Sequence, residues 1–183
     1  MRKCAILSMD SLADFEAYDA LIDQPMLALG WQTELVSWRN SAVNWSDYDV
    51  VVIRSPWDYQ DDMASFVKVL ESIEQSSARL ENSLAVVQWN INKIYLTQLE
   101  ADGVTIVPTL WPETFNADNL AGYFSHFSTE QMVLKPRVSA NADNTFWLTQ
   151  DNYQNKVAEL NTAFAHRELM VQPFMADICQ EGE

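Results

Sequence analysis

Val133-Leu134-Lys135-Pro136 ends an apolar strand and leads directly into a loop of small polar residues, 137–144. A loop of small residues lets backbone N–H groups approach an anion closely, and a neighbouring lysine adds positive charge. The stretch therefore predicts a strand and loop that hold phosphate. An edge lysine followed by an ordinary hairpin loop explains the same residues equally well, because the loop contains no glycine.

Composition places the chain among globular proteins. Of its 183 residues, 48% are hydrophobic and 20% charged, which is enough to build a core. The net charge of −15 argues against nucleic acid and against an anionic membrane as partners, since both require basic surface. Two cysteines at opposite ends, no signal peptide and no run of about 20 apolar residues predict a cytoplasmic protein.

Strands alternate with helices in the first half of the chain. Short apolar or β-branched runs predict strands, and apolar residues at helical spacing predict helices. The expected strands are 4–9, 31–38, 49–54 and 83–88, and the expected helices are 18–29, kinked by Pro25, and 61–73. This order predicts an α/β fold with an open, mostly parallel sheet.

The second half opens with a helix and then becomes richer in strands. The expected elements are a helix over 90–102, strands over 104–108, 131–135 and 145–149, a helix over 151–164 and a strand over 168–174. We place the domain boundary after residue 108, which gives a first domain over 1–108 and a second over 109–183.

Lys93 lies early in the expected helix 90–102. A cation near the positive end of a helix dipole is unfavourable by a few tenths of a kcal/mol. A second phosphate contact would explain this placement, and so would a solvated helix lysine.

Arg54, Trp57 and Asp58 follow the strand with the strongest pattern, 49–54. Ligands of open α/β sheets bind beyond the carboxyl ends of strands. An arginine at that edge can grip a carboxylate through two nitrogens, and an aromatic wall excludes water. The alternative is a surface loop that its aromatic residues anchor by packing.

Glycine-based nucleotide motifs are excluded, because the chain has only four glycines and none of the usual fingerprints. The two histidines lie far apart in sequence, and no spacing of histidine, cysteine and carboxylate suggests zinc.

Taken together, the motifs resemble the ATP-grasp superfamily of carboxylate–amine ligases, and within it the glutathione-synthetase-like branch that includes the cycloserine-forming ligases. The segments that carry the resemblance, in the order of the family, are 53–59, 89–96 with 103–109, 133–136 with its loop, and 171–174 leading to 181–183. The resemblance implies a Rossmann-like pre-ATP-grasp domain with a parallel sheet, followed by a partial α+β ATP-grasp subdomain that ends at the hinge.

The resemblance also implies roles for individual residues. Lys93 and Lys135 would contact ATP; Ser139, Ala140 and Asn141 would form the phosphate loop; the backbone of Gln172, Pro173 and Phe174 would read adenine; Glu183 would hold the ribose; Arg54, Trp57 and Asp58 would contact substrate. The ligands of Mg²⁺ are expected beyond residue 183, and none is expected within the chain. The chain would then be an N-terminal portion of such an enzyme, truncated and not catalytically complete.

The implied reaction transfers phosphate from ATP to a small amino-acid-like carboxylate, and an amine then attacks the acyl phosphate. A non-catalytic module that binds a nucleotide, a small ligand or another protein is the alternative, and a structural α/β domain is a third reading. The last strand, near Phe174, is expected to leave an unpaired edge, which favours a homodimer.

Overall fold

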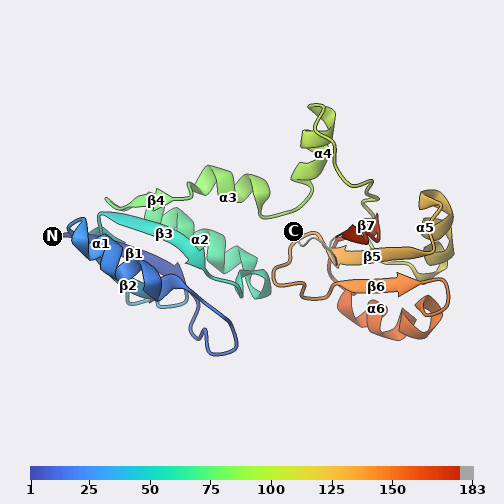
Figure 1. Ribbon diagram of the computed structural model, residues 1–183, viewed down its shortest axis with the longest axis horizontal. Helices are drawn as coiled ribbons and strands as arrows, with labels where there is room; N and C mark the ends of the chain where they lie inside the picture. Colours follow the sequence, from blue (N-terminus) through green and yellow to red (C-terminus); the bar gives the residue numbers. More distant parts are fainter. Residues whose placement is uncertain (178–183) are drawn as a thin grey trace. The chain divides into compact units, whose positions relative to one another are not determined.

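Parallel strands form the sheet of the first part of the chain, in the order β2-β1-β3-β4 (Figure 1). Their bounds are Arg2–Ser8 for β1, Trp31–Ser37 for β2, Val50–Ser55 for β3 and Arg79–Glu81 for β4. The β1 strand has the buried run expected of a central parallel strand, because five consecutive residues from Cys4 to Ser8 are buried. The carboxyl ends of β1 and β3 therefore meet at one edge of this sheet.

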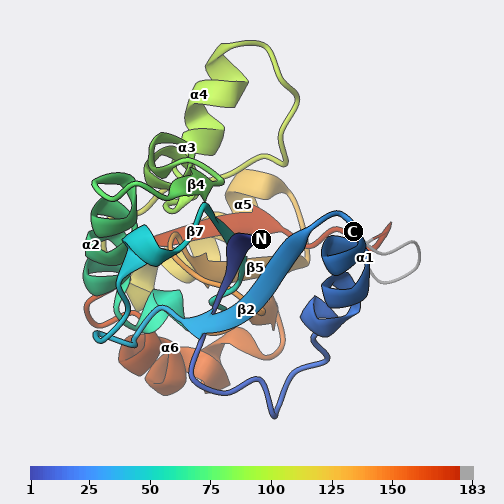
Figure 2. The same cartoon turned by 90° about the vertical axis from the view of Figure 1, so that its left-hand side faces the viewer.

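Two helices cover opposite faces of the parallel sheet, α1 (Asp23–Ala28) and α2 (Met63–Glu74) (Figure 2). The side chain of Asp62 accepts a hydrogen bond from the N–H of Ser65 and so caps the start of α2. Buried residues of α2 recur at helical spacing, and the core that they join lies between this helix and the sheet. Core residues include Leu7, Val36, Trp38, Val51, Phe66, Leu70 and Ile73.

An antiparallel sheet of order β6-β5-β7 forms the second part of the chain. Its strands are β5 (Gln131–Pro136), β6 (Phe146–Thr149) and β7 (Leu169–Pro173), and its helices are α5 (Leu120–Phe127) and α6 (Val157–Ala163). Both helices pack on one face of the sheet, where they bury Leu120, Phe124, Met132, Leu134, Leu148, Leu160 and Val171. The opposite face carries the residues considered below.

The structure describes residues 1–177. The chain divides into two units, 1–91 and 92–183. One unit holds the parallel sheet and the other the antiparallel sheet, so the predicted α/β fold class with a second α+β part is confirmed. The units divide after Ile91, and α4 (Tyr95–Ala101) groups with the second. The domain boundary after residue 108 stays a prediction.

The strand predicted over 83–88 is wrong, because these residues lie in α3 (Leu84–Asn90). Leu84, Val87 and Ile91 recur at helical spacing and pack against the core of the first unit, which favours a helix for this short apolar run. The strand at this edge of the sheet is instead β4, which is only three residues long.

The strand predicted over 104–108 is also wrong. The carbonyl of Val107 accepts a hydrogen bond from the Thr109 hydroxyl at 2.7 Å, and Val104 is half exposed. Pairing begins only at Leu110, which forms an isolated antiparallel bridge with Val171. The helix predicted over 90–102 is shorter than expected and comprises α4 alone.

Five short 3-10 helices lie between the other elements of the described residues. They are η1 (Asp19–Ile22), η2 (Trp45–Asp47), η3 (Tyr59–Asp61), η4 (Ala117–Asn119) and η5 (Tyr153–Lys156). The η1 and α1 helices together occupy most of the helix predicted over 18–29, and η5 with α6 occupies most of the helix predicted over 151–164.

Candidate functional site

Lys93 precedes α4 and does not lie within a helix as predicted, so the argument from the helix dipole does not apply to it. The Nζ of Lys93 donates to the carbonyl oxygen of Ser139 at 2.8 Å and to its hydroxyl at 2.9 Å. The backbone N–H of Lys93 donates to the carbonyl of Arg137 at 2.9 Å. Both ends of this residue are therefore attached to the polar loop 137–144.

The two predicted phosphate lysines influence one another. Burial and, to a smaller extent, the positive charge of Lys135 together lower the pKa of Lys93 to about 8. Lys93 comes from the segment before α4 and Lys135 from β5, so the fold brings together two cations that are distant in sequence. An anion bound beside both would remove the repulsion between them.

The polar loop is shaped by local turns. The Ser139 hydroxyl donates to the Pro136 carbonyl at 3.2 Å, and Asn141, Ala142 and Asn144 adopt left-handed backbone angles with φ of 52°, 57° and 50°. Asparagine tolerates this conformation better than most residues because its side chain forms local hydrogen bonds. The predicted loop residues, among them Ser139 and Asn141, thus build a defined bend without glycine.

The face of the antiparallel sheet opposite its helices carries Lys135 and Val133, because side chains of a strand alternate between faces and Met132 and Leu134 are buried. The strand register places Trp147 and Gln172 directly opposite Val133, one on each neighbouring strand. The face therefore has an apolar part, Val133 and Trp147, beside the polar Gln172, with Lys135 further along β5.

An aromatic pair borders this face. The ring of Trp147 is 55% exposed and stacks on the ring of Phe174, with 4.7 Å between centroids and 15° between planes. The Nε1 of Trp147 donates to Oε1 of Gln131 at 3.1 Å, which holds the indole in place. Sequence reasoning named Phe174 and missed Trp147. The hairpin register between the strands around Val133 and Trp147 is the signal that could have found it.

The backbone groups of β7 point away from β5 at every second residue. Val171 exchanges both backbone hydrogen bonds with Leu110, away from β5, whereas the N–H of Phe174 donates to Gln131 on β5 at 3.0 Å. Because the direction alternates along a strand, the carbonyl of Pro173 points to the same outer side as Val171. Pro173 has no N–H, and the N–H of Phe174 is bonded to Gln131 on β5. Neither residue of the predicted hinge segment can therefore donate a backbone hydrogen bond to a base at this edge.

The side chain of Gln172 points along the same face and donates from Nε2 to the Thr109 hydroxyl at 2.9 Å. This bond attaches the segment before Leu110 to β7. Gln172 therefore connects β7 to the segment before Leu110, and the backbone role predicted for it stays a prediction.

In the first unit, Arg54 lies at the carboxyl edge of the parallel sheet, where it was predicted. Its Nε donates to Oδ1 of Asp19 at 3.0 Å, and the Arg54 side chain is 47% exposed. The other oxygen of Asp19 accepts a hydrogen bond from the Ser55 hydroxyl, whose oxygen accepts in turn from the Ser8 hydroxyl at 2.9 Å. Asp19, Ser8 and Ser55 are buried, so one carboxylate organises the ends of β1 and β3. Sequence reasoning missed Asp19.

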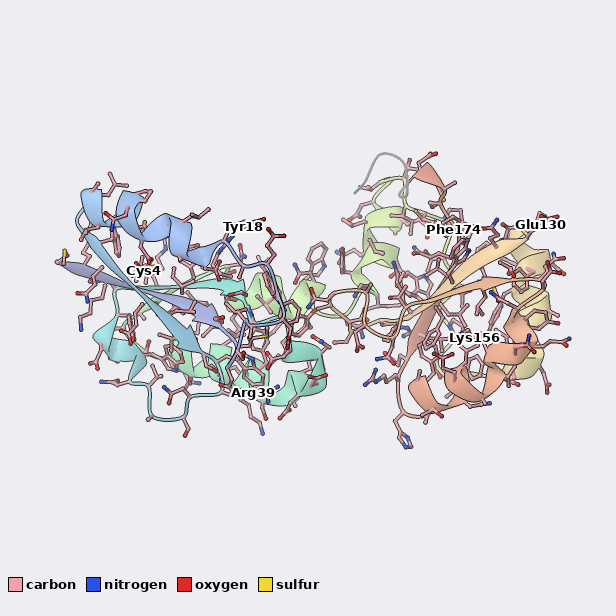
Figure 3. All side chains as sticks on the ribbon, turned by 60° about the horizontal axis from the view of Figure 1, so that its bottom comes forward. Cys4, Tyr18, Arg39, Glu130, Lys156 and Phe174 are labelled. Carbon is pink, nitrogen blue, oxygen red and sulfur yellow. The ribbon has the colours of Figure 1, made fainter. Side chains whose placement is uncertain are left out.

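Asp58 and Trp57 have partners within the same unit. Asp58 accepts from Nε1 of Trp38 at 2.7 Å and from Nε of Arg39 at 2.9 Å, and Arg39 (labelled in Figure 3) also lies over the ring of Trp38. Trp57 packs against the core and lies 5.3 Å from the ring of Phe15. Of the predicted substrate residues, Arg54 is the one whose charged group is turned to the sheet edge.

Some predictions lie outside what the structure describes. Glu183 falls beyond residue 177, so its predicted ribose contact lies outside the described residues. Within residues 1–177, no three side chains of histidine, cysteine, aspartate or glutamate gather in a way that could hold a metal ion. Over the same range, none of the helices has the length and apolar character needed to cross a membrane.

Sequence comparison finds similarity between this chain and a cycloserine biosynthesis protein. Residues 4–82 match the family model of the N-terminal domain of the D-cycloserine synthetase DcsG. The cycloserine biosynthesis protein DcsG of Streptomyces lavendulae is 27% identical over 165 residues, which are 85% of this chain and 53% of that protein. The chain thus spans about half the length of this curated relative.

Structural comparison gives the same fold. The crystal structure of D-cycloserine synthetase DcsG superposes with a TM-score of 0.85 at 20% identity and covers 98% of this chain and 62% of that one. An ATP-grasp RimK domain protein from Sphaerobacter thermophilus gives 0.71 at 16% identity, covering 94% and 64%. Carboxyaminoimidazole ribonucleotide synthase from Aspergillus clavatus, complexed with ATP, gives 0.66 at 16% identity, covering 96% and 47%. The chain therefore resembles an N-terminal portion of an ATP-grasp ligase and has the fold of that portion.

Proposed function

We propose that this chain is part of an ATP-dependent carboxylate–amine ligase and that it binds the phosphates of ATP through Lys93, Lys135 and the loop 137–144. The proposal depends chiefly on the pair of lysines, because the charge of Lys135 lowers the pKa of a Lys93 that is already partly desolvated. Two cations held together in this way are stabilised by a polyanion. The Ser139 contacts of Lys93 place the loop beside the same charge.

The remaining groups of the second unit fit a purine. The apolar face around Val133 and Trp147 offers a flat surface for a base. The outward carbonyl of Pro173 can accept a hydrogen bond from the exocyclic amine of adenine. The next outward donor along the chain is the N–H of Met175, so we assign the second contact with the base to Met175 rather than to Phe174.

The reaction that we propose transfers phosphate to a small amino-acid-like carboxylate, after which an amine attacks the acyl phosphate. Arg54 supports the substrate part, because Asp19 holds its Nε while the half-exposed guanidinium faces the sheet edge. In such phosphoryl transfers Mg²⁺ neutralises the phosphates. Because residues 1–177 contain no cluster of metal ligands, we assign its ligands to none of them.

The test is ATP binding to matched variants of the chain. Lys93→Met and Lys135→Met each remove one cation, and Lys156→Met removes a lysine that forms an ion pair with Glu159 beside α6 (Lys156 is labelled in Figure 3). We expect ATP to shift the NMR resonances of the wild type and of Lys156→Met. Lys93→Met and Lys135→Met should each bind ATP more weakly. Equal affinity in all the proteins would refute the nucleotide site.

A non-catalytic binding module is the second candidate. It is favoured by the partners of Asp58, which is held by Trp38 and Arg39 and is not turned toward a ligand. The two candidates differ in turnover. The assay supplies ATP, Mg²⁺, an amine and a small carboxylate to a protein with the full length of its relatives. A ligase would release ADP, whereas a binding module would bind ATP and release no ADP.

A further inference from the structure

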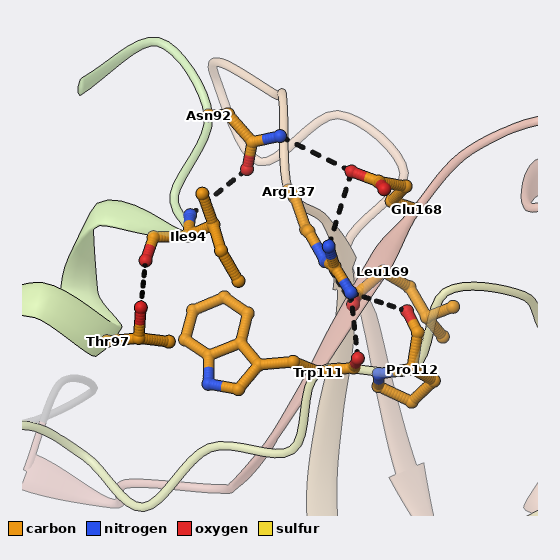
Figure 4. Close-up of polar contacts among 8 residues, drawn as sticks. All are labelled: Asn92, Ile94, Thr97, Trp111, Pro112, Arg137, Glu168 and Leu169. Carbon is orange, nitrogen blue, oxygen red and sulfur yellow. Dashed lines mark hydrogen bonds and ion pairs between the residues drawn. The ribbon is translucent and has the colours of Figure 1, made fainter. Parts of the chain in front are cut away.

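Arg137 is a buried arginine at the start of the polar loop, only 7% exposed. Its Nε donates to the Leu169 carbonyl at 3.2 Å, and its Nη2 donates to the carbonyls of Trp111 and Pro112 at 2.7 and 3.0 Å (Figure 4). A buried guanidinium requires partners for its donors, and here they come from two separate segments of the second unit. Arg137 thus ties the beginning of β7 to the segment after Leu110.

Glu168 extends this arrangement toward α4. Its carboxylate forms an ion pair with Nη1 of Arg137 at 3.3 Å and accepts a hydrogen bond from Nδ2 of Asn92 at 3.3 Å (Figure 4). The Oδ1 of Asn92 in turn accepts from the backbone N–H of Ile94 at 3.0 Å. Lys93 lies between Asn92 and Ile94, so the side chain of Asn92 fixes the backbone on both sides of Lys93.

Lys93 is attached to the same group of residues through its backbone. Its N–H donates to the carbonyl of Arg137, so the arginine that binds Glu168 through its side chain also binds Lys93 through its main chain. We propose that Asn92, Glu168 and Arg137 form a positioning network that sets the place of the Lys93 ammonium beside Lys135 and the polar loop. This inference rests on the proposed nucleotide site.

The network acts on the backbone around Lys93, whereas the ammonium lies at the end of a long flexible side chain. A lysine side chain has considerable rotamer freedom, which is lost when the ammonium is held in one place. Fixing the main chain on both sides of Lys93 limits the positions that its Nζ can reach to those near Ser139. A loosened turn would let the ammonium move into water and away from Lys135.

The decisive measurement is the pKa of the Lys93 ammonium, followed by side-chain NMR in the ligand-free chain. Asn92→Ala and Glu168→Gln each remove one connection of the network at an exposed or half-exposed side chain, and Arg137→Lys keeps the charge but loses the fork of donors. We expect the pKa of Lys93 to rise from about 8 toward the ordinary lysine value in each variant that folds. A network that only supports stability would lower the melting temperature and leave that pKa unchanged.

Matched controls come from α6, within the same unit. Asn161→Ala removes an asparagine whose amide donates to the Val157 carbonyl, and Glu159→Gln removes the partner of Lys156. We expect neither control to change the pKa of Lys93. If Arg137→Lys does not fold, Asn92→Ala and Glu168→Gln still test the inference, because they leave the buried guanidinium in place.

ATP affinity separates failure of this inference from failure of the proposed function. We expect ATP to bind Asn92→Ala and Glu168→Gln about three- to tenfold more weakly than the wild type, a change typical of one lost hydrogen bond to a charged group. Unchanged ATP affinity together with an unchanged Lys93 pKa would overturn the network while leaving the nucleotide site intact. A wild type that does not bind ATP would refute the nucleotide site, and the Lys93 pKa would still decide whether the network positions the lysine.

Discussion

The ammonium of Lys93 is bonded twice to Ser139, a residue 46 positions later in the chain, once at the backbone carbonyl and once at the hydroxyl. Both acceptors belong to the loop assigned to the phosphates of ATP. The loop and the lysine are thus held together before any ligand arrives. In the proposed site, a bound phosphate would compete with Ser139 for the same ammonium, which would couple ligand binding to the position of the loop.

The affinity for ATP is predicted to fall as the pH rises above about 8. The pKa of Lys93 is about 8 in the ligand-free protein, so the group loses its proton above this pH, and bound phosphate favours the protonated form. Binding should therefore take up a proton in this range. Calorimetry in two buffers of different ionisation enthalpy would measure that uptake. An affinity that is flat between pH 7 and about 9 would contradict the assignment of Lys93.

Stability has the opposite dependence on pH. The pKa of Lys93 in the folded protein lies below the value of about 10.4 expected in the unfolded chain. Between these two values the unfolded chain binds the additional proton, so the contribution of Lys93 to the free energy of unfolding rises as the pH increases from about 8 to about 10. Lys93→Met should lack this rise. The difference between the two proteins in urea unfolding, measured across this range, removes the contributions of the tyrosines that both share.

Leu134→Ala is predicted to destabilise the second unit by about 2–5 kcal/mol, because the Leu134 side chain is fully buried against α5 and α6. Val133→Ala is the matched control on the opposite face of the same strand and should lose about 1 kcal/mol or less. Hydrogen exchange of the β5 and β6 amides would follow both variants. Equal losses would mean that both faces of the sheet are covered to the same extent.

Asp19→Asn is predicted to destabilise the first unit by about 1–3 kcal/mol. The carboxylate accepts from both Arg54 and the buried Ser55, and an amide presents a donor to one of them. The exposed Asp14→Asn is a control of the same chemistry and should have no measurable effect. Exchange rates of the β1 and β3 amides would show the loss. Protection that is unchanged in Asp19→Asn would show that the carboxylate is dispensable for the fold.

Much of the fold was predictable because it depends on local patterns. The run 4–9 and the β-branched run at Val51 have the pattern of buried parallel strands, and the alternation in β5 gives its two faces correctly. The order of short motifs also indicated the ATP-grasp resemblance that the comparisons bear out. The apolar run at 83–88 is too short for its pattern to distinguish a strand from a helix. The helical conformation packs Val87 against the core of the first unit, which no local pattern could indicate.

The connections of the site were not predictable in the same way. Arg137 stands next to the motif that drew attention to the loop, yet its partners are carbonyl groups, which every residue has and which no sequence pattern marks. Glu168 is an ordinary polar residue until the register of β5 and β7 brings it beside Arg137, and Asn92 joins it from the segment before α4. The role of Asp19 likewise depends on the parallel pairing of β1 with β3, which places Ser8 beside Ser55. The ligand roles assigned to all of the predicted site residues, Ala140 and Glu183 included, stay predictions, as does the homodimer.

The left-handed residues of the polar loop bear on the entropy of ligand exchange. A glycine-rich loop has many conformations in the free protein and loses most of them when it closes on a ligand. Ala142 and its asparagine neighbours have fewer conformations to lose, although the left-handed angle of an alanine costs about 1–2 kcal/mol in the folded chain. The ordering is thus completed during folding and not during binding. In the proposed nucleotide site, entry of a phosphate would then require Lys93 to separate from Ser139, and it would require little further ordering of the loop.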